Sequence, residues 1–458
     1  MNKEDLVSFT IKTLEEIDTN ADYLHNWHIE LICEYLKKVY IGDIKRLIIN
    51  VPPRSLKSVC VSVAFPSWVL ANNPSEKIIA VSYSQVLGIK HSTDCRKIMQ
   101  SNWYQKITNT RIRKGESEKR KFITLENGYR FTTSVGGSLT GEGGNIIIVD
   151  DPHNPLKIFN PKEREKVHNW FEGVLMSRLN NKKKGKIIIV MQRLHIDDLT
   201  GYLTSKKYSP WKILSIPAIE DQDKIYHFNN KIYKFRQEGD ILHNKREDIK
   251  LIQNTISELG SFVFSAQYQQ NPISADGIIN KNWFCEVNDE NIKFESIYFS
   301  LDTAVSQNEN SDYTVIMKIG VLQNSFYILD IIRERLNYIQ LKNKMLNTLS
   351  NDINTKIIIE DKNIGSSLIQ DLKSLTKNPI ISVNPHKDKL TRLISVISIL
   401  ESKKVLILKD AKWKKDFLLE ATSFPNGLHD DQVDTLTQFL NYIKDKKEIK
   451  RNPRLRML

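Results

Sequence analysis

The sequence contains few cysteines, and they stand far apart. Four are present, Cys33, Cys60, Cys95 and Cys285, and no two of them form a C-x-x-C pair. This spacing excludes a zinc ribbon and a disulfide framework, and it fits a reducing cytosol. Apolar runs are no longer than a strand, so we expect no membrane span. The N-terminal residues alternate charged and apolar side chains, and we therefore expect no signal peptide.

The composition is that of an ordinary folded protein with a basic excess. The chain has 458 residues, of which 40% are hydrophobic and 26% charged, which excludes a disordered or collagen-like chain. Lys and Arg number 67 against 54 Asp and Glu, which gives a formal net charge of +13. An excess of this size favours a polyanionic partner, nucleic acid before anionic lipid. The alternative is compositional drift, because Ile, Lys and Asn are abundant throughout.

The first half of the chain alternates short apolar strands with helical stretches. A helix is predicted from Gln85 to Gln100, and a hairpin is predicted to turn at Asn127-Gly128. Continuous Ile/Val strands separated by helices indicate a parallel sheet that is covered on both faces. The predicted strands are 46–51, 77–82, 145–149 and 186–191.

A second α/β region is predicted to begin near residue 296. The stretch 205–270 before it is predicted to be a small subdomain, with a hairpin near Asn229-Asn230 and a helix from Glu247 to Gln270. The polar stretch 271–295 is predicted to be a linker. From residue 296 the predicted order is β-β-β-α-β-α with acids at the strand ends, which is the ribonuclease H pattern. A basic tail, 443–458, is expected to be flexible.

A lysine-containing loop follows the first predicted strand. The strand RLIINV leads into Pro-Pro-Arg-Ser-Leu-Lys-Ser and then a helix. In a strand–loop–helix of this kind the backbone N–H groups face phosphates, Lys57 would reach the β- and γ-phosphates, and the Ser58 hydroxyl would ligate Mg²⁺. The usual G-x-x-x-x-G-K-[ST] pattern would place glycines at Val51 and Leu56, and both are absent. An ordinary strand–turn–helix with a capping serine is the alternative.

An apolar strand that ends in two acids supports the nucleotide interpretation. The segment IIIVDD ends at Asp150 and Asp151. Asp150 would hold the hydration shell of Mg²⁺, and Asp151 would polarise the attacking water, a position where most P-loop ATPases carry Glu. The order of a lysine loop followed by an acidic strand is normal for P-loop NTPases. Two solvated acids at a strand end are the alternative.

A set of carboxylates in the second half predicts a metal nuclease. Asp302 follows one strand and Glu360-Asp361 another, while Asp431 and Asp434 lie on the same side of a helix start. Hydrolysis of a phosphodiester uses two divalent ions, and Mg²⁺ and Mn²⁺ prefer carboxylate ligands. Asp302 would bridge both ions. Glu360 is preferred to Asp361 because it comes first after the strand, and Asp430 remains an alternative to Asp431.

Seven segments in order resemble the large terminase subunit of tailed bacteriophages and prophages. They run from about residue 26 to about residue 440 and read PPRSLKS, GGSLTGEGGNIIIVDDPH, MQRLHIDDLTG, AQYQQNP, SLDTA, IEDKNIGSSLIQDL and HDDQVDTLTQ. The resemblance implies an α/β fold, with an N-terminal P-loop (RecA/ASCE-like) ATPase domain in 1–270 and a C-terminal RNase H-like nuclease domain in 296–442. It implies ATP-driven movement of double-stranded DNA into a procapsid and endonucleolytic cleavage of concatemeric DNA.

The resemblance also assigns residues to the nucleotide site. Arg54, Ser55, Lys57 and Ser58 would form the phosphate loop, with Asp150 and Asp151 as the acidic pair. His28 or Trp27 would pack on the adenine, although an aromatic helix cap is nearly as good an interpretation. Arg54 is the preferred arginine for stabilising the transition-state charge, ahead of Arg178 and Arg193. Gln192-Arg193 stands where the family couples phosphate release to movement.

The implied cofactors are ATP and Mg²⁺, with Mn²⁺ as a substitute at the nuclease site. The implied partners are double-stranded DNA, a portal protein on the procapsid and a small terminase subunit, in the cytoplasm of a bacterial host. A ring, most simply a pentamer, is expected on the portal, and a monomer in isolation. The competing hypotheses are a superfamily 2 helicase, a ribonuclease H-like transposase or resolvase with an accessory ATPase, and a prophage relic that only binds DNA.

Overall fold

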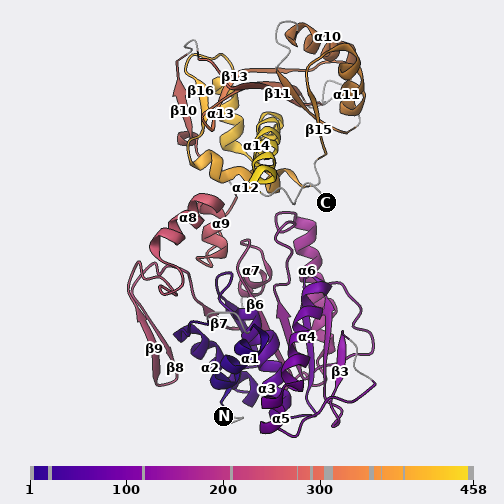
Figure 1. Cartoon of the computed structure of the whole chain (residues 1–458), viewed down its shortest axis with the longest axis vertical. Coiled ribbons are helices and arrows are strands. Elements are labelled where there is room, and N and C mark those ends of the chain that lie inside the picture. The colour runs from indigo at the N-terminus through magenta and orange to yellow at the C-terminus, as the bar shows by residue number, and fades with distance from the viewer. Residues whose placement is uncertain are drawn as a thin grey trace. The chain divides into compact units, whose positions relative to one another are not determined.

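The chain divides into two compact units. The computed structural model describes residues 5–18, 23–115, 119–206, 210–275, 277–288, 292–303, 313–349, 355–362, 364–384 and 387–451, and within α14 it describes side chains to residue 446. The first unit comprises residues 1–254 and 263–273, and the second comprises residues 255–262 and 274–458. Figure 1 shows both units and labels most of their elements.

The first unit is built around a seven-stranded sheet in the order β3-β4-β2-β5-β6-β1-β7, with a separate β8-β9 hairpin. Every neighbouring pair in the large sheet is parallel except β3 and β4, which confirms the predicted parallel sheet. Its elements are α1 (Leu6–Ile17), α2 (Trp27–Ile41), β1 (Arg46–Asn50), η1 (Val59–Ala64), α3 (Phe65–Asn72), β2 (Lys77–Ser82), α4 (Gln85–Gln100), α5 (Asn102–Ile107), β3 (Lys121–Ile123), β4 (Tyr129–Ser134), β5 (Ile146–Asp150), α6 (Pro161–Gly173), η2 (Leu175–Arg178), β6 (Lys186–Met191), α7 (Leu199–Thr204), β7 (Lys212–Ser215), β8 (Lys224–Phe228) and β9 (Lys231–Arg236). Helices α8 (Ile249–Leu259) and α9 (Ser261–Gln267) each contribute residues to both units.

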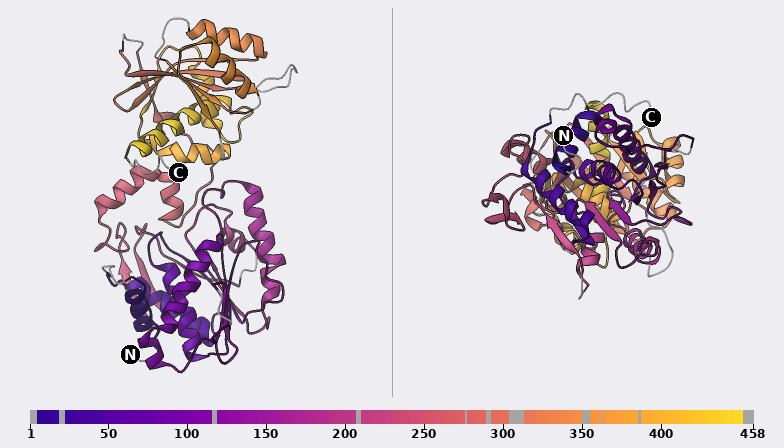
Figure 2. Two further views of the ribbon diagram at one scale, coloured as in Figure 1. Left: turned by 45° about the vertical axis from the view of Figure 1, so that its right-hand side comes forward. Right: turned by 90° about the horizontal axis from the view of Figure 1, so that it is seen from below.

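Both faces of this sheet are covered, because successive residues of each strand point to opposite sides. In β1, Leu47 and Ile49 join a core with helices α1 to α5, whereas Ile48 joins a second core with α6, η2 and α7. Figures 1 and 2 show these two helical layers on either side of the strands. The continuous Ile/Val strands of the sequence are thus explained by burial on two sides.

The segment after the phosphate loop departs from the predicted single helix. Residues Val59–Ala64 form a π-helical turn, and α3 begins only at Phe65. Pro66 has no N–H, so it cannot donate to the carbonyl of Ser62 four residues earlier. That carbonyl instead accepts a hydrogen bond from the buried Arg130 side chain at 3.2 Å. The wider turn brings both Ser58 and Ser62 to the end of β5.

The second unit contains a mixed seven-stranded sheet in the order β10-β16-β13-β12-β11-β14-β15. Strands β11, β12 and β13 are antiparallel neighbours, and β14 pairs parallel to β11. Its elements are η3 (Lys281–Trp283), β10 (Phe284–Val287), β11 (Ser296–Asp302), β12 (Thr314–Leu322), β13 (Ser325–Glu334), α10 (Tyr338–Leu349), β14 (Lys356–Glu360), α11 (Ile364–Leu375), β15 (Ile380–Val383), α12 (Lys389–Glu401), β16 (Val405–Leu408), α13 (Lys414–Ser423) and α14 (Asp431–Arg451).

Helices again cover both faces of the second sheet. One core contains side chains of α10 and α11, and the other contains side chains of α12, α13 and α14. Figure 2 shows α10 and α11 on one side of the strands and α12 to α14 on the other. The predicted strands and the helix after β13 are present. The last helix of the predicted β-β-β-α-β-α order, at 431–442, is α14, and α11, β15, α12, β16 and α13 lie between β14 and this helix.

Three segments differ from their predicted structure. Residues 284–287, inside the stretch predicted to be a linker, form β10 and pair with β16. Helix α14 continues to Arg451, well into the predicted flexible tail, because Ile443 is buried and Lys444 donates to the carbonyl of Ser395 at 2.8 Å. The helical stretch predicted before residue 270 is divided into α8 and α9 at Gly260, whose φ is +83°. Residues 452–458 of the predicted tail lie outside the described residues.

We expect Phe439→Ala to lower the unfolding free energy of the second unit by about 3–5 kcal/mol. Phe439 is fully buried and makes edge contacts with Tyr298 and Phe326. Leu428→Ala is the control, because Leu428 is 98% exposed, and it should change stability by less than about 0.5 kcal/mol. Urea unfolding measures both, and equal effects of the two substitutions would contradict this packing.

Candidate nucleotide and metal sites

The lysine loop forms a compact turn between β1 and η1 without any glycine. Arg54 and Leu56 both adopt left-handed backbone conformations, with φ values of 60° and 61°. Such conformations cost non-glycine residues roughly 1–2 kcal/mol each. The Leu56 side chain packs against the core of the first unit, which offsets part of that cost. The missing glycines therefore do not prevent the tight turn.

Lys57 lies at the carboxyl edge of the sheet, among residues from three segments. Its Nζ is 3.4 Å from Oδ2 of Asp151 and donates to Oε1 of Gln192 at 3.1 Å. The side chain is largely buried, with 8% of its surface exposed. Asp151 follows β5 and Gln192 follows β6, and β6 lies between β5 and β1 in the sheet. The strand order thus brings the lysine loop to the acidic strand end.

The two acids after β5 have different surroundings. Asp150 is buried and accepts hydrogen bonds from the hydroxyls of Ser58, at 2.9 Å, and Ser62, at 2.6 Å. Burial raises the pKa of Asp150, although both hydroxyls and Lys57 oppose the rise. Burial, opposed by Lys57 and reinforced by Asp150, raises the pKa of Asp151 to about 6. A carboxyl group with a pKa near neutrality is suited to polarise a water molecule.

His28 supports the backbone of the phosphate loop. Its Nε2 lies 3.2 Å from the carbonyl of Ser55, and its Nδ1 lies 2.8 Å from the side-chain amide nitrogen of Asn26. Burial lowers the pKa of His28 to about 3, so the ring is neutral, and Nε2 can donate while Nδ1 accepts. The ring of Trp27 packs on Tyr226 instead, with centroids 4.8 Å apart.

A cavity of about 350 Å³ opens beside the phosphate loop. His28, Arg54 and Leu56 line it together with Tyr23, and His243 and Arg246 close it from the loop after β9. Arg246 also donates to the carbonyl of Arg54. No local pattern in the sequence pointed to His243 or Arg246 as lining residues. They reach the cavity only because the chain folds back, and Arg246 lies almost two hundred residues beyond Arg54.

The three arginines considered from the sequence are placed differently. Arg54 is exposed and lines the cavity, whereas Arg178 donates to Ser177 and to the carbonyl of Leu139. Both carboxylate oxygens of Asp198 accept from Nε of Arg193 at 2.9 Å. Arg54 is thus the one of these three that faces the cavity.

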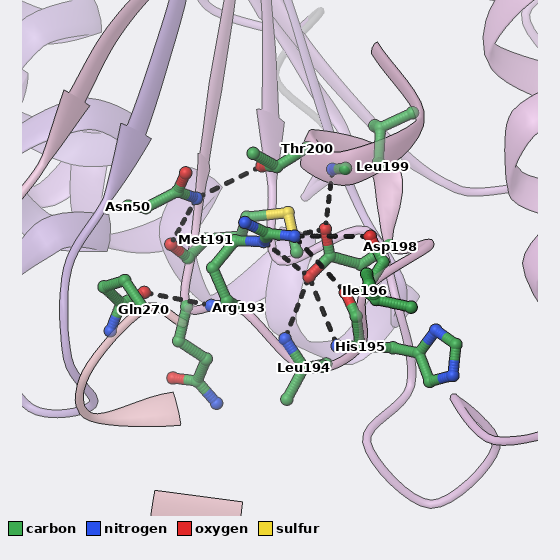
Figure 3. A network of polar contacts seen from close by, with 12 residues as sticks. Asn50, Met191, Arg193, Leu194, His195, Ile196, Asp198, Leu199, Thr200 and Gln270 are labelled. Carbon is green, nitrogen blue, oxygen red and sulfur yellow. Dashed lines mark hydrogen bonds and ion pairs between the residues drawn. The ribbon is translucent and has the colours of Figure 1, made fainter. Parts of the chain in front are cut away.

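The loop after β6 is fixed by a polar network around Asp198 (Figure 3). This fully buried carboxylate accepts from Arg193 and from the backbone N–H groups of Leu194 and Gly201. The N–H of Arg193 in turn donates to Oε1 of Gln270 at 3.0 Å. Because this loop begins at Gln192, the network holds the residue that contacts Lys57.

Four acids of the second unit gather at the ends of β11 and β14. Asp302 ends β11 and Glu360 ends β14, and the two strands are direct neighbours. Asp431 and Asp434 are buried in the first turn of α14. Burial, followed by the charges of Asp434, Glu360 and Asp431, raises the pKa of Asp302 to about 7. These predicted ligands therefore lie close enough to repel one another.

The two neighbouring acids point elsewhere. Asp361 accepts hydrogen bonds from the hydroxyls of Ser366, at 2.6 Å, and Ser382, at 2.7 Å, and these bonds lower its pKa. Asp430 pairs with Lys389 at 2.6 Å and shares this lysine with Asp434. The geometry favours Glu360 over Asp361, and Asp431 is preferred to Asp430 because its charge is among those that raise the pKa of Asp302.

Basic side chains lie among these carboxylates. Arg392 is 2.9 Å from Asp434 and 3.7 Å from Glu360, and Lys389 is 2.9 Å from Asp434. Both cations come from α12, and sequence reasoning missed them because isolated basic residues are common on helices. It also missed the buried Glu420, which accepts from the backbone N–H groups of Gln432 and Val433 and so holds the start of α14.

The four carboxylates Asp302, Glu360, Asp431 and Asp434 suit a hard divalent cation in their chemistry, but their present arrangement does not form a metal-binding group. Carboxylate oxygens are the ligands that Mg²⁺ and Mn²⁺ prefer, and the mutual repulsion at Asp302 would be relieved by a bound cation. Within the part of the chain that the structure describes, no group of three or more His, Cys, Asp or Glu is arranged to hold a metal ion. The carboxylates fit the metal in chemistry, while Lys389 and Arg392 occupy some of their oxygens.

Comparison with known proteins finds a family match in the second unit. Residues 299–442 match the family described as the terminase RNaseH-like domain. The large terminase of a thermophilic bacteriophage has a similar fold, with a TM-score of 0.53 at 12% identity, over 89% of this chain and 98% of that chain. The complex of that terminase with ATP-gamma-S gives a TM-score of 0.51 at 11% identity, with the same coverage. The predicted fold class and the family resemblance of the C-terminal region are confirmed.

No curated protein sequence matches the chain. None of the helices in the described ranges is long and apolar enough to cross a membrane.

We expect Asp302→Asn to stabilise the metal-free protein more at pH 8 than at pH 5. Because the folded-state pKa of about 7 lies above the ordinary value of 3.8, the folded state binds a proton more tightly, and Asp302 costs stability as pH rises through this window. Removing the charge should recover a few kcal/mol at pH 8, about 1.4 kcal/mol per pKa unit. Urea unfolding in EDTA measures this difference.

Asp361→Asn is the matched control for this prediction. The pKa of Asp361 is lowered by Ser366 and Ser382, so its ionised form favours folding and its removal should not stabilise the protein at pH 8. An Asp302→Asn variant with an unchanged pH dependence would show that the carboxylates do not act on one another.

Proposed function

We propose that the chain is the large subunit of a phage or prophage terminase. It would use ATP hydrolysis to move double-stranded DNA into a procapsid, and it would cut concatemeric DNA with a metal-dependent nuclease. The observation that carries this proposal is the presence of one charged cluster in each unit, Lys57 with Asp150 and Asp151 in the first and Asp302 with Glu360 in the second. The family match of residues 299–442 supports it.

The first cluster has the groups that ATP hydrolysis requires. The Lys57 ammonium would leave Asp151 and contact the β- and γ-phosphates of ATP. The backbone N–H groups of the loop would face the same phosphates. The Ser58 hydroxyl and Asp150, 2.9 Å apart, would hold Mg²⁺, which neutralises charge on the phosphates. Asp151, with its raised pKa, would then be free to polarise the attacking water.

The remaining contacts to the nucleotide would come from residues that line the cavity beside the phosphate loop. Its volume of about 350 Å³ and its position beside Arg54 and His28 suit an adenosine. His28 would act by fixing the carbonyl of Ser55, with Arg54 placed to stabilise charge developing on the phosphates. The large terminase of the thermophilic bacteriophage has been solved with ADP and with ATP-gamma-S, which supports nucleotide binding by this fold.

The second cluster has the groups for metal-assisted cleavage of DNA. Asp302, Glu360, Asp431 and Asp434 would hold two divalent ions, with Asp302 as the ligand shared by both. Two such ions activate the attacking water and stabilise the leaving oxygen of a phosphodiester. Mg²⁺ would serve, and Mn²⁺ would substitute for it because both prefer oxygen ligands.

The proposed partners follow from this function. Double-stranded DNA would be held in part by the net charge of +13, so its binding should weaken with salt. A portal protein, a small terminase subunit and a ring of copies, most simply a pentamer, would complete the motor in the host cytoplasm. The helicase alternative required a second RecA-like domain, and the RNaseH-like family match occupies that part of the chain instead.

We expect Lys57→Ala to abolish ATP hydrolysis while leaving Mn²⁺-dependent plasmid nicking within about twofold of the wild type. The lysine is needed only where phosphates bind, in the first unit. Phosphate release and plasmid nicking, measured on the same preparation, test the expectation. Loss of both activities in a folded variant would refute the assignment of two independent centres.

Asp302→Ala is the reciprocal variant. It should lower the rate of plasmid nicking at least about a hundredfold, because a bridging carboxylate contacts both ions. The rate of ATP hydrolysis should stay unchanged. Persistent nicking by the purified variant would contradict the proposed metal site.

A further inference from the structure

Lys389 and Arg392 bind the carboxylate cluster in a way that a metal ion would have to undo. Asp388 caps α12 by accepting from the N–H of Thr391 at 3.0 Å, and this cap fixes the first turn from which both cations project. Arg392 bridges Glu360, at the end of β14, and Asp434, on α14. Lys389 bridges Asp434 and Asp430.

These contacts compete directly with metal ligation. Asp434 has 4% of its side chain exposed, and its Oδ1 and Oδ2 are each taken by one cation at 2.9 Å. A carboxylate oxygen that accepts from an ammonium or guanidinium group has less capacity to ligate a divalent ion. Burying this charge without a partner would be costly, so the cations explain how the acids remain together without metal.

Two further cations lie near these acids. Lys362, which is 56% exposed, is 2.8 Å from Oε1 of Glu360. Arg333 is held differently: it is 3.9 Å from Asp431, but it also lies 3.7 Å from the buried Glu420 and 4.2 Å from the centre of the Tyr313 ring. Those contacts would remain if Asp431 turned to a metal ion. Lys389, by contrast, has 49% of its side chain exposed and a flexible stem, so it can leave the carboxylates.

We propose that Lys389 and Arg392 are the resident counter-ions of the nuclease carboxylates, that a divalent ion displaces them from Asp434 and Glu360, and that Lys389 then holds a non-bridging oxygen of the DNA phosphate. This inference rests on the proposed nuclease function. Lys389 would then have two effects. It would weaken metal binding when DNA is absent, and it would strengthen DNA binding when metal is present.

The first test measures metal binding by the full-length protein without DNA. Lys389→Gln should bind Ca²⁺ and Mn²⁺ about 3–10-fold more tightly than the wild type in calorimetry, because a positive charge beside the ion is removed. Lys389→Arg keeps the charge and should stay within about twofold. The control is Lys342→Gln, since Lys342 pairs with Asp371 at 3.0 Å on other elements of the same unit.

The second test measures binding of a DNA duplex in Ca²⁺. Lys389→Gln should weaken binding about 3–10-fold and reduce the slope of log K against log salt concentration by about one. Lys342→Gln should change neither quantity. Arg392→Gln should also tighten metal binding, which provides a second reading if Lys389→Gln is poorly folded.

The outcomes separate this inference from the proposed function. Unchanged or weaker metal binding in folded Lys389→Gln and Arg392→Gln overturns the inference, as does DNA binding by Lys389→Gln equal to that of the wild type. If the wild type itself binds no more metal than Asp302→Asn, the nuclease proposal fails, and this inference fails with it.

Discussion

Both candidate sites depend on the hydrogen bonding of neighbouring strands, which makes the carboxyl ends of parallel strands finish at one edge of a sheet. In the first unit, Asp150 pairs in register with Val190, and Asn50 pairs with Met191. The residues that follow these strands, including Lys57, Asp151 and Gln192, therefore meet although they are far apart in sequence. In the second unit, the pairing of Leu301 with Ile359 places Asp302 beside Glu360 in the same way.

Bringing acids together at a buried edge has an electrostatic cost, and both units meet it with a lysine. Lys57 lies against Asp151 in the first unit, and Lys389 lies against Asp430 and Asp434 in the second. The costs remain visible in the raised pKa values of Asp151 and Asp302, about 6 and about 7. In the proposed mechanism, phosphates of ATP would become the partner of Lys57 and leave Asp151 free for catalysis. A phosphate of DNA would become the partner of Lys389 and leave Asp434 free to bind metal.

Local sequence was sufficient for features that depend on neighbouring residues. The helix Gln85–Gln100 and the hairpin turning at Asn127-Gly128 were predicted correctly, because apolar periodicity and turn chemistry act over a few residues. The acids at strand ends could also be found, since an apolar run followed by Asp or Glu is a local pattern. Their assembly into one cluster followed from assuming the sheet topology.

Features set by distant contacts could not be predicted. Strand β10 spans only Phe284–Val287, and it forms because β16 offers it an edge. Leu56 adopts a glycine-like conformation because its side chain is held by the core. Arg246, which lines the cavity beside the phosphate loop, and Arg392, which bridges two acids, act through residues far away in sequence. No pattern around either residue distinguishes it from other surface arginines.

The central claim is that one chain contains two separate centres for phosphate chemistry. The most direct measurement is a crystal structure of the full-length protein with ATP-gamma-S and Mn²⁺, with manganese located by anomalous scattering. One manganese is expected at Ser58 and Asp150 beside the nucleotide, and manganese is also expected at Asp302, Glu360 and the start of α14. Manganese absent from the Asp302 cluster, or a nucleotide bound away from Lys57, would contradict this claim.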